Sequence, residues 1–225
     1  MALLYKAELV PSKLELIAGW APNQPWFAGN TSAGLTNVAA FRLDDPAGEV
    51  GLETVLIQAG DGPVLQVPLT YRGAPLVGGE AWLIGTTQHS VLGERWVYDA
   101  TGDPVYLAEV AATALTGGVQ AEQYIEQDGE RIVREPTARV VGDGEHGAVT
   151  PAVPAIGVVS TRHENNTTVT NAGEFQVVVF RHLITPGQNT DIEVSDTAEA
   201  PSATLAGSWP AQPDPQRMVL VTLRS

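Results

Sequence analysis

The chain has 225 residues, 44% of them hydrophobic, and its 26 acidic residues against 12 basic ones give a formal net charge of −14 at pH 7. So acidic a surface repels phosphate backbones and argues against nucleic-acid binding, and the absence of cysteine excludes disulfides and thiolate metal sites. No apolar run approaches the roughly 18 residues of a membrane span, and the first residues lack a signal-peptide pattern, so we expect a cytoplasmic protein without membrane attachment.

The first part of the chain predicts a short strand, one helix and then a series of strands. Residues 3–10 alternate weakly, and Ser12 and Glu15 have the spacing of a capping box that opens a helix to Trp20. Turn sequences rich in Asp, Gly and Pro separate the runs that follow. Their regular spacing predicts an antiparallel meander of strands at 36–43, 53–58, 64–71, 80–87 and 94–98.

A second helix is predicted to begin at Asp103-Pro104 and to end before Gly117-Gly118. Aspartate is a good N-cap, and proline suits the first helical position because it has no N–H to lose there. Alanines recur within this segment, which favours close packing of the helix against a sheet; they stand at positions 108, 111, 112 and 114.

The second part of the chain again predicts strands, with one more helix. The segment 142–147 is loop-like and is interpreted as a boundary or a flexible tip, and 198–215 as an irregular connector. Thr190 and Glu193 form a capping box that predicts a third helix to about residue 200. The fold class expected is therefore α+β, mostly antiparallel with about three helices; the remaining strands are expected at 119–125, 132–141, 156–161, 167–171, 174–183 and 218–223.

Familiar catalytic and metal-binding motifs are absent from the sequence. The four histidines, at 89, 146, 163 and 182, have no metal-ligand spacing, and neither a phosphate-binding loop nor a dinucleotide fingerprint is present. We therefore expect no metal and no cofactor.

Two adjacent aromatic residues, Trp26 and Phe27, follow the first helix. They can close the helix against the sheet as part of the core, which is the more common arrangement. Alternatively, they can form an aromatic contact surface for a partner or for a sugar ring.

The segments 24–30, 66–71 and 97–104, in this order along the chain, resemble the N-terminal cap of the maltokinases of actinobacteria. Members of that family phosphorylate maltose with ATP. Three further segments look like the kinase-like subdomain that follows the cap: Asn166-Thr167-Thr168, Val179-Phe180-Arg181 and 187–194. The resemblance implies a cap subdomain at residues 1–118 and a subdomain like a kinase N-lobe at 119–225.

The same resemblance assigns a nucleotide site from which one component is missing. Asn165, Asn166, Thr167 and Thr168 match a polar turn near the nucleotide phosphates. Glu193 matches the helix glutamate that pairs with the phosphate-binding lysine, but Val178 stands where that lysine would be, so a positive charge and three donors are lost. Arg181, three residues further on, falls on the opposite face of a regular strand.

These observations predict a protein without catalytic activity of its own. No kinase catalytic loop follows before Ser225, so we expect no phosphoryl transfer by this chain alone. The leading hypothesis is a kinase-derived interaction or regulatory module, with a protein of maltose, trehalose or α-glucan metabolism, or a second copy of itself, as partner. Two alternatives stay open, a module that binds a small sugar or phosphate and one half of a split sugar kinase.

Overall fold

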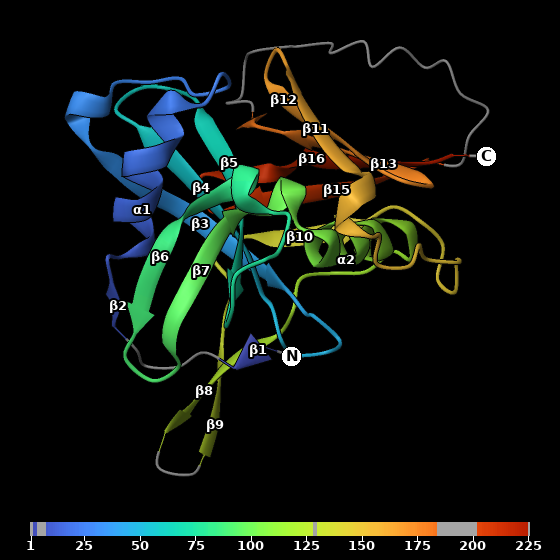
Figure 1. The fold of residues 1–225 in the computed structure, drawn as a ribbon, viewed down its shortest axis with the longest axis horizontal. Coiled ribbons are helices and arrows are strands. Elements are labelled where there is room, and N and C mark those ends of the chain that lie inside the picture. Colours follow the sequence, from blue (N-terminus) through green and yellow to red (C-terminus); the bar gives the residue numbers. More distant parts are fainter. Residues whose placement is uncertain (1, 4–7, 128–129, 184–201, 225) are drawn as a thin grey trace.

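The computed structural model describes residues 2–3, 8–127, 130–183 and 202–224, which form three sheets and two α-helices (Figure 1). Strands account for 49% of the structure and helices for 18%, and the sheets curl into a half-barrel. The expected α+β fold with about three helices is therefore wrong. The two helices are only eight and twelve residues long, whereas the strands build both large sheets; the third expected helix, at 190–200, lies outside the described residues.

The larger sheet has seven strands, and all its neighbouring strands are antiparallel. The antiparallel pairing expected from the turn spacing is present, but the expected meander is only partly right. Strands that follow one another in the chain are neighbours over residues 35–72, whereas the strand at 64–72 then pairs with the strand at 93–99 and not with the one at 83–89. The strand order is β2-β6-β7-β5-β4-β3, with β14 added beside β5. Its strands are β2 (Leu9–Val10), β3 (Leu35–Leu43), β4 (Gly51–Ala59), β5 (Val64–Arg72), β6 (Leu83–His89), β7 (Gly93–Asp99) and β14 (His182–Leu183).

Helix α1 (Lys13–Trp20) packs on this sheet and begins with the capping box that the sequence predicts. The Glu15 amide donates to Ser12 Oγ, and the Ser12 amide donates to the Glu15 carboxylate, so two free amide groups are satisfied. Ile17 is fully buried on the helix face that meets the sheet, in a core shared with Trp26 and Val67.

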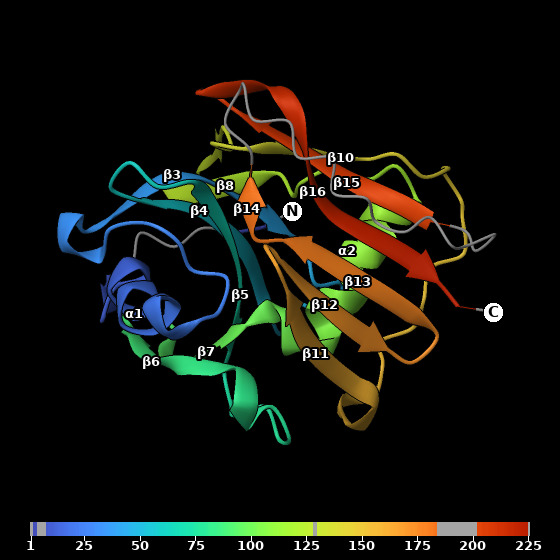
Figure 2. The same cartoon turned by 90° about the horizontal axis from the view of Figure 1, so that it is seen from above.

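The second sheet has six antiparallel strands in the order β10-β15-β16-β13-β12-β11. Helix α2 (Pro104–Leu115) packs on one face of this sheet, against β15, β16 and β10 (Figure 2). The helix begins as predicted, because the Asp103 carboxylate accepts from the Val105 amide and proline occupies the first turn. The strands are β10 (Arg139–Gly142), β11 (Val159–Glu164), β12 (Thr167–Ala172), β13 (Phe175–Phe180), β15 (Ser202–Trp209) and β16 (Gln212–Leu223).

The β15–β16 hairpin replaces most of the irregular connector expected at 198–215. Two prolines, Pro213 and Pro215, lie within β16. They are accommodated because β13 pairs only with residues 219–223 of β16. The proline-containing part therefore has an edge without a partner strand among the described residues, where a missing N–H costs no ladder bond.

A third, small sheet projects from the body of the protein (Figure 1). It consists of β1 (Ala2–Leu3), β8 (Gln123–Gln127) and β9 (Glu130–Arg134), with β8 in the middle. The single strand expected at 132–141 is divided into β9 and β10, and Pro136 stands between the two. Five short 3₁₀ helices complete the fold: η1 (Ala21–Asn23), η2 (Thr31–Ala33), η3 (Glu80–Trp82), η4 (Ala100–Gly102) and η5 (Ile156–Val158).

The principal hydrophobic core contains residues from both expected subdomains. Phe41 and Leu56 come from the first large sheet, Leu107 from α2, and Val177 and Val219 from the second. The subdomain boundary at 118–119 stays a prediction, but one continuous core lies across it.

The segment that begins the expected flexible loop at 142–147 is tied to the end of α2. The Gly142 amide donates to Gly118 O over 2.8 Å, and the Gly144 amide donates to Ala114 O over 3.0 Å. Asp143 is linked to Thr204 through both its amide and its carboxylate. Residues 142–144 are thus anchored by hydrogen bonds on two sides.

Candidate functional site: a buried arginine between two sheets

The candidate site is centred on Arg181, at the point where the chain passes from one large sheet to the other. β13 ends at Phe180 in the second sheet, and β14 begins at His182 in the first. The Arg181 amide donates to Asn166 O over 2.7 Å, and the Arg181 carbonyl accepts from the Gln66 amide over 2.8 Å. The backbone of this one residue therefore joins the β11–β12 hairpin to β5.

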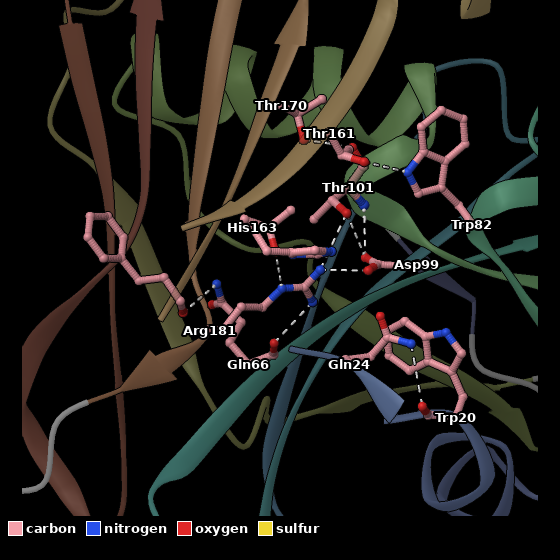
Figure 3. Close-up of polar contacts among 12 residues, drawn as sticks. Trp20, Gln24, Gln66, Trp82, Asp99, Thr101, Thr161, His163, Thr170 and Arg181 are labelled. Atoms are coloured by element: carbon pink, nitrogen blue, oxygen red, sulfur yellow. Dashed lines mark hydrogen bonds and ion pairs between the residues drawn. The ribbon is translucent and has the colours of Figure 1, made fainter. Parts of the chain in front are cut away.

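The guanidinium of Arg181 is completely buried and is held by four side-chain or backbone oxygens (Figure 3). Its Nη2 donates to Asp99 Oδ2 over 2.6 Å and to Thr101 Oγ1 over 3.3 Å. Its Nε donates to Thr168 Oγ1 over 2.7 Å, and Nη1 donates to the Gln66 carbonyl over 3.4 Å. A buried charge is tolerated only when it is paired and hydrogen-bonded in this way.

Asp99 and Thr101 are placed by the turn that follows β7. The Asp99 carboxylate accepts from both the amide and the hydroxyl of Thr101, and so caps η4. The Thr101 carbonyl in turn accepts from Thr170 Oγ1 over 2.9 Å. Asp99 thus serves as turn cap and as countercharge, and its turn is tied to β12.

Trp26 covers the guanidinium on another side. Arg181 Cζ lies 4.5 Å from the centre of the Trp26 ring, within the range of a cation–π contact. Trp26 is only 1% exposed, and its carbonyl oxygen lies 2.6 Å from His182 Nε2. The indole Nε1 of Trp26 is buried without a hydrogen-bond partner among the described residues. We call Arg181, Asp99, Thr101, Thr168, Gln66 and Trp26 together the Arg181 cluster.

His163 is the exposed end of this network. Its Nδ1 lies 3.1 Å from Thr168 Oγ1. Because the Arg181 Nε–H can only donate, the Thr168 oxygen accepts from it, and the Thr168 hydroxyl hydrogen is free to donate to Nδ1 of a neutral imidazole. Burial and then the nearby Arg181 charge lower the pKa of His163, while Asp99 opposes them.

Other cations of the chain are also committed to buried carboxylates. Lys13 and Arg42 both pair with Glu53, which also accepts from the Tyr71 hydroxyl. Burial acts to raise the pKa of Glu53, but Arg42 and Lys13 outweigh it and the pKa is lowered. Arg72 likewise pairs with Asp103 at 2.6 Å. These cations stabilise the fold and are not free to form an anion site.

The residues that the resemblance assigns to the nucleotide site do not form one cluster. Asn165 and Asn166 form the tight β11–β12 turn, where Asn165 adopts a left-handed φ of 50° that asparagine tolerates. Thr167 and Thr168 follow in β12. Val178 pairs with Val169 in the neighbouring strand, and so lies on the face of the sheet opposite Thr168.

The remaining predicted site residues are placed as follows. Glu193 lies outside the described residues. Trp26 is buried in the Arg181 cluster, and Phe27 is half-buried against the smaller hydrophobic core. Both aromatic residues thus occupy the position expected of a plug that closes α1 against the sheet.

Sequence reasoning missed Asp99, Thr101, Gln66 and His163 as members or neighbours of this site. Asp99 and Thr101 carried one local signal, because an aspartate two residues before a threonine is typical of a side-chain-capped turn. No signal could have paired Asp99 with Arg181, since 82 positions separate them. Within the part of the chain that the structure describes, no group of three His, Asp or Glu residues could hold a metal ion.

The comparison with protein families found one similarity, in the first part of the chain. Residues 20–103 match the family model of the maltokinase N-terminal cap domain. The predicted resemblance to the maltokinase cap is thereby confirmed for these residues. No curated protein matches the chain. Neither of the two helices described is long and apolar enough to cross a membrane.

The residues that match the cap-domain model supply four of the six members of the Arg181 cluster. Trp26, Gln66, Asp99 and Thr101 lie within the matched residues, whereas Thr168 and Arg181 come from the part beyond it. Arg181 is therefore one of the contacts that join the later strands to the matched residues, together with the β14–β5 pairing and the Thr170–Thr101 hydrogen bond.

Proposed function

We propose that this chain is a cap-type interaction module that acts in the cytoplasm on a protein of maltose, trehalose or α-glucan metabolism, and that it does not itself transfer phosphate. The maltokinase cap domain links the chain to that area of carbohydrate chemistry. The observation that carries the proposal is the use of Arg181, whose guanidinium donates to Thr168 of the expected phosphate turn, as a buried clamp.

Val178 supports this proposal because its surroundings suit an apolar side chain. It is 8% exposed and belongs to the principal hydrophobic core, between Val169 and Leu220 on the adjoining strands. A phosphate-binding lysine needs a polar cleft around its ammonium group, and a charge placed among these valines would be desolvated. The position is thus adapted to packing.

Arg181 cannot replace the missing lysine in this arrangement. Its guanidinium is fully buried, its charge is neutralised by Asp99, and four donor contacts are already made within the protein. Binding a phosphate there would require the Asp99 pair to be broken.

The hydroxyl groups of the expected phosphate turn are also engaged. Thr167 Oγ1 donates to Glu164 O over 2.8 Å, and Thr168 is fully buried beneath the guanidinium. These contacts disfavour the alternative of a phosphate-binding module built on the same turn.

Calorimetric titration of the full chain with magnesium–ATP and, separately, with maltose tests the proposal. We expect no binding of ATP with a Kd below about 1 mM, which corresponds to roughly −4 kcal/mol. The variant Val178→Lys should not create such binding, and Val178→Met is the matched control of similar length without the charge. Tight ATP binding by the wild-type chain would contradict the proposal.

Native co-purification tests the interaction role itself. A tagged full chain, cross-linked in the cells that produce it, should recover an enzyme that makes or consumes maltose, trehalose or an α-glucan. Recovery of the free chain alone, under conditions that preserve known complexes of the same cells, would contradict the interaction role.

A further inference from the structure

We infer that strand β9 (Glu130–Arg134) is a self-recognition edge, which pairs antiparallel with β9 of a second copy of this chain. Strands β8 and β9 of one copy and the same two strands of the other would then form one continuous four-stranded sheet across a two-fold axis. This inference is independent of the proposed function, because it rests on a different part of the molecule.

The outer edge of β9 is open among the residues that the structure describes. In the small sheet the order is β1-β8-β9, so no strand among the described residues pairs with the outer side of β9. All five residues of β9 are exposed, including two large apolar ones, Ile132 at 41% and Val133 at 53%. The β8–β9 hairpin also projects away from the rest of the protein, which leaves room beside it (Figure 1). An edge of this kind presents unpaired N–H and C=O groups to another strand.

The charges along β9 are arranged for pairing with themselves. Glu130, Ile132 and Arg134 lie on one face of the strand, because alternate residues point the same way. When Ile132 faces Ile132 of the second copy, each Glu130 faces Arg134 of the other copy. Two ion pairs then flank an apolar contact, a cross-strand arrangement that stabilises antiparallel sheets.

Within the part of the chain that the structure describes, the charges of Glu130 and Arg134 are not used in an ion pair. Neither Glu130 nor Arg134 has an ion-pair partner among the residues that the structure describes. On the other face of β9, Arg131 lies 3.8 Å from the centre of the Tyr124 ring, so it is held by its own hairpin. The pairing therefore does not have to break an existing salt bridge of Glu130 or Arg134.

Other registers are less favourable. A two-fold axis perpendicular to the sheet keeps its faces, so only residues of the same face can oppose one another, and shifts by one residue are excluded. Two registers lie next to it. The one centred on Arg131 places two arginines opposite each other, and the one centred on Val133 places Ile132 against Arg134 of the second copy. The register centred on Val133 also relies on Glu135, which already pairs with Arg139 at 2.6 Å. The register centred on Ile132 is thus selected.

Five paired residues make a small contact, so we expect an equilibrium between monomer and dimer that depends on protein concentration. Sedimentation velocity of the full chain over a range of concentrations measures it. Glu130→Arg and Arg134→Glu should each weaken dimerisation by about tenfold or more, because each places like charges opposite one another twice.

Charge exchange separates this pairing from simple damage to the hairpin. The double variant Glu130→Arg/Arg134→Glu should dimerise like the wild-type chain, and an equal mixture of the two single variants should form heterodimers. Both outcomes require Glu130 to face Arg134 of the other copy. Failure of the double variant to recover dimerisation, or a wild-type chain that stays monomeric at all concentrations, would overturn the inference.

A cysteine cross-link tests the register directly, because the chain contains no cysteine of its own. Ile132→Cys should form a disulfide-linked dimer under mild oxidation, since the two positions are directly opposite. Val133→Cys, the matched control on the other face, should cross-link far less. Equal cross-linking of both variants would overturn the register.

Discussion

Replacing Asp99 by asparagine should destabilise the protein strongly, because it removes the countercharge of Arg181 without changing the size of the side chain. Asparagine keeps the oxygen that accepts from the Thr101 amide, so the cap of η4 is preserved. The variant therefore tests the loss of the negative charge while the hydrogen bond that caps the turn is kept.

The magnitude follows from burial. Arg181 is 0% exposed, and Asp99 is 4% exposed, so the charge left behind cannot reach water. Removing one partner of such a pair typically costs about 3–5 kcal/mol. This is a large share of a domain stability of roughly 5–15 kcal/mol, and it should lower the urea midpoint by about 1 M or more.

Urea unfolding followed by tryptophan fluorescence measures this loss, with Trp26 reporting from beside the guanidinium. Glu135→Gln is a matched control, since the Arg139–Glu135 pair has the same 2.6 Å distance but side chains 65% and 80% exposed. Exposed pairs contribute no more than about 1 kcal/mol. If Asp99→Asn costs no more than Glu135→Gln, the reasoning about the buried pair is refuted.

A second variant separates charge from packing. The double change Asp99→Leu with Arg181→Met removes both charges and leaves apolar groups of similar size, which in buried pairs is often neutral or stabilising. It should be more stable than Asp99→Asn. A double variant less stable than the single one would show that the hydrogen bonds, and not the charge, hold this site.

The remaining predictions concern pH, packing and Val178, where the resemblance implies a lysine. Because the pKa of His163 is lowered from 6.5, first by burial and then by Arg181, the unfolded chain binds this proton more tightly, and stability should fall as pH drops through 6.5. His163→Gln should reduce that loss of stability, measured as the difference between the urea midpoints at about pH 7.5 and about pH 5.5. The pKa of His89 is also lowered, by burial and then by Arg95, so His89 contributes to the pH dependence of both the wild-type chain and the variant. Gly144→Ala should lower the free energy of unfolding in urea by about 1–3 kcal/mol, since its Cβ would lie 2.0 Å from Leu115 O. Gly157→Ala, a control with open space around the added Cβ, should leave that free energy within about 0.5 kcal/mol of wild type. Val178→Lys should lower the midpoint of thermal unfolding more than Val178→Met, because only the lysine brings a charge into the core. Equal shifts of the two midpoints would contradict the burial of this side chain.

Local signals predicted the helix boundaries well. The capping box at Ser12 and Glu15 and the Asp103-Pro104 start both depend on residues within one helical turn, and both are present in the structure. The turn spacing of the first large sheet was sufficient for its antiparallel pairing but not for its strand order, in which β7 and not β6 lies beside β5. The motifs quoted for the cap were confirmed as a family match at residues 20–103.

Long-range features could not be predicted from local patterns. The β15–β16 hairpin was missed because Pro213 and Pro215 are typical of connectors, and only the sheet topology shows that they lie where β13 does not pair. The break between β9 and β10 was missed because the apolar runs on both sides of Pro136 look like one strand.

The candidate site was only partly accessible to the same reasoning. Strand alternation correctly placed Arg181 and Val178 on opposite faces. The partner of Arg181 depends on two sheets meeting, and Asp99 stands 82 positions away in the chain. Pairing of residues so distant is decided by tertiary packing and leaves no mark on the sequence nearby.

Maltose-dependent release of ADP from magnesium–ATP, measured on the purified full chain, tests the central claim most directly. The claim is that Val178 and Arg181 serve packing and a buried ion pair, and not phosphate binding. We predict no ADP release above the rate without maltose, in both the wild-type chain and Val178→Lys. Maltose-dependent release by the wild-type chain, free of other kinases, would contradict the account.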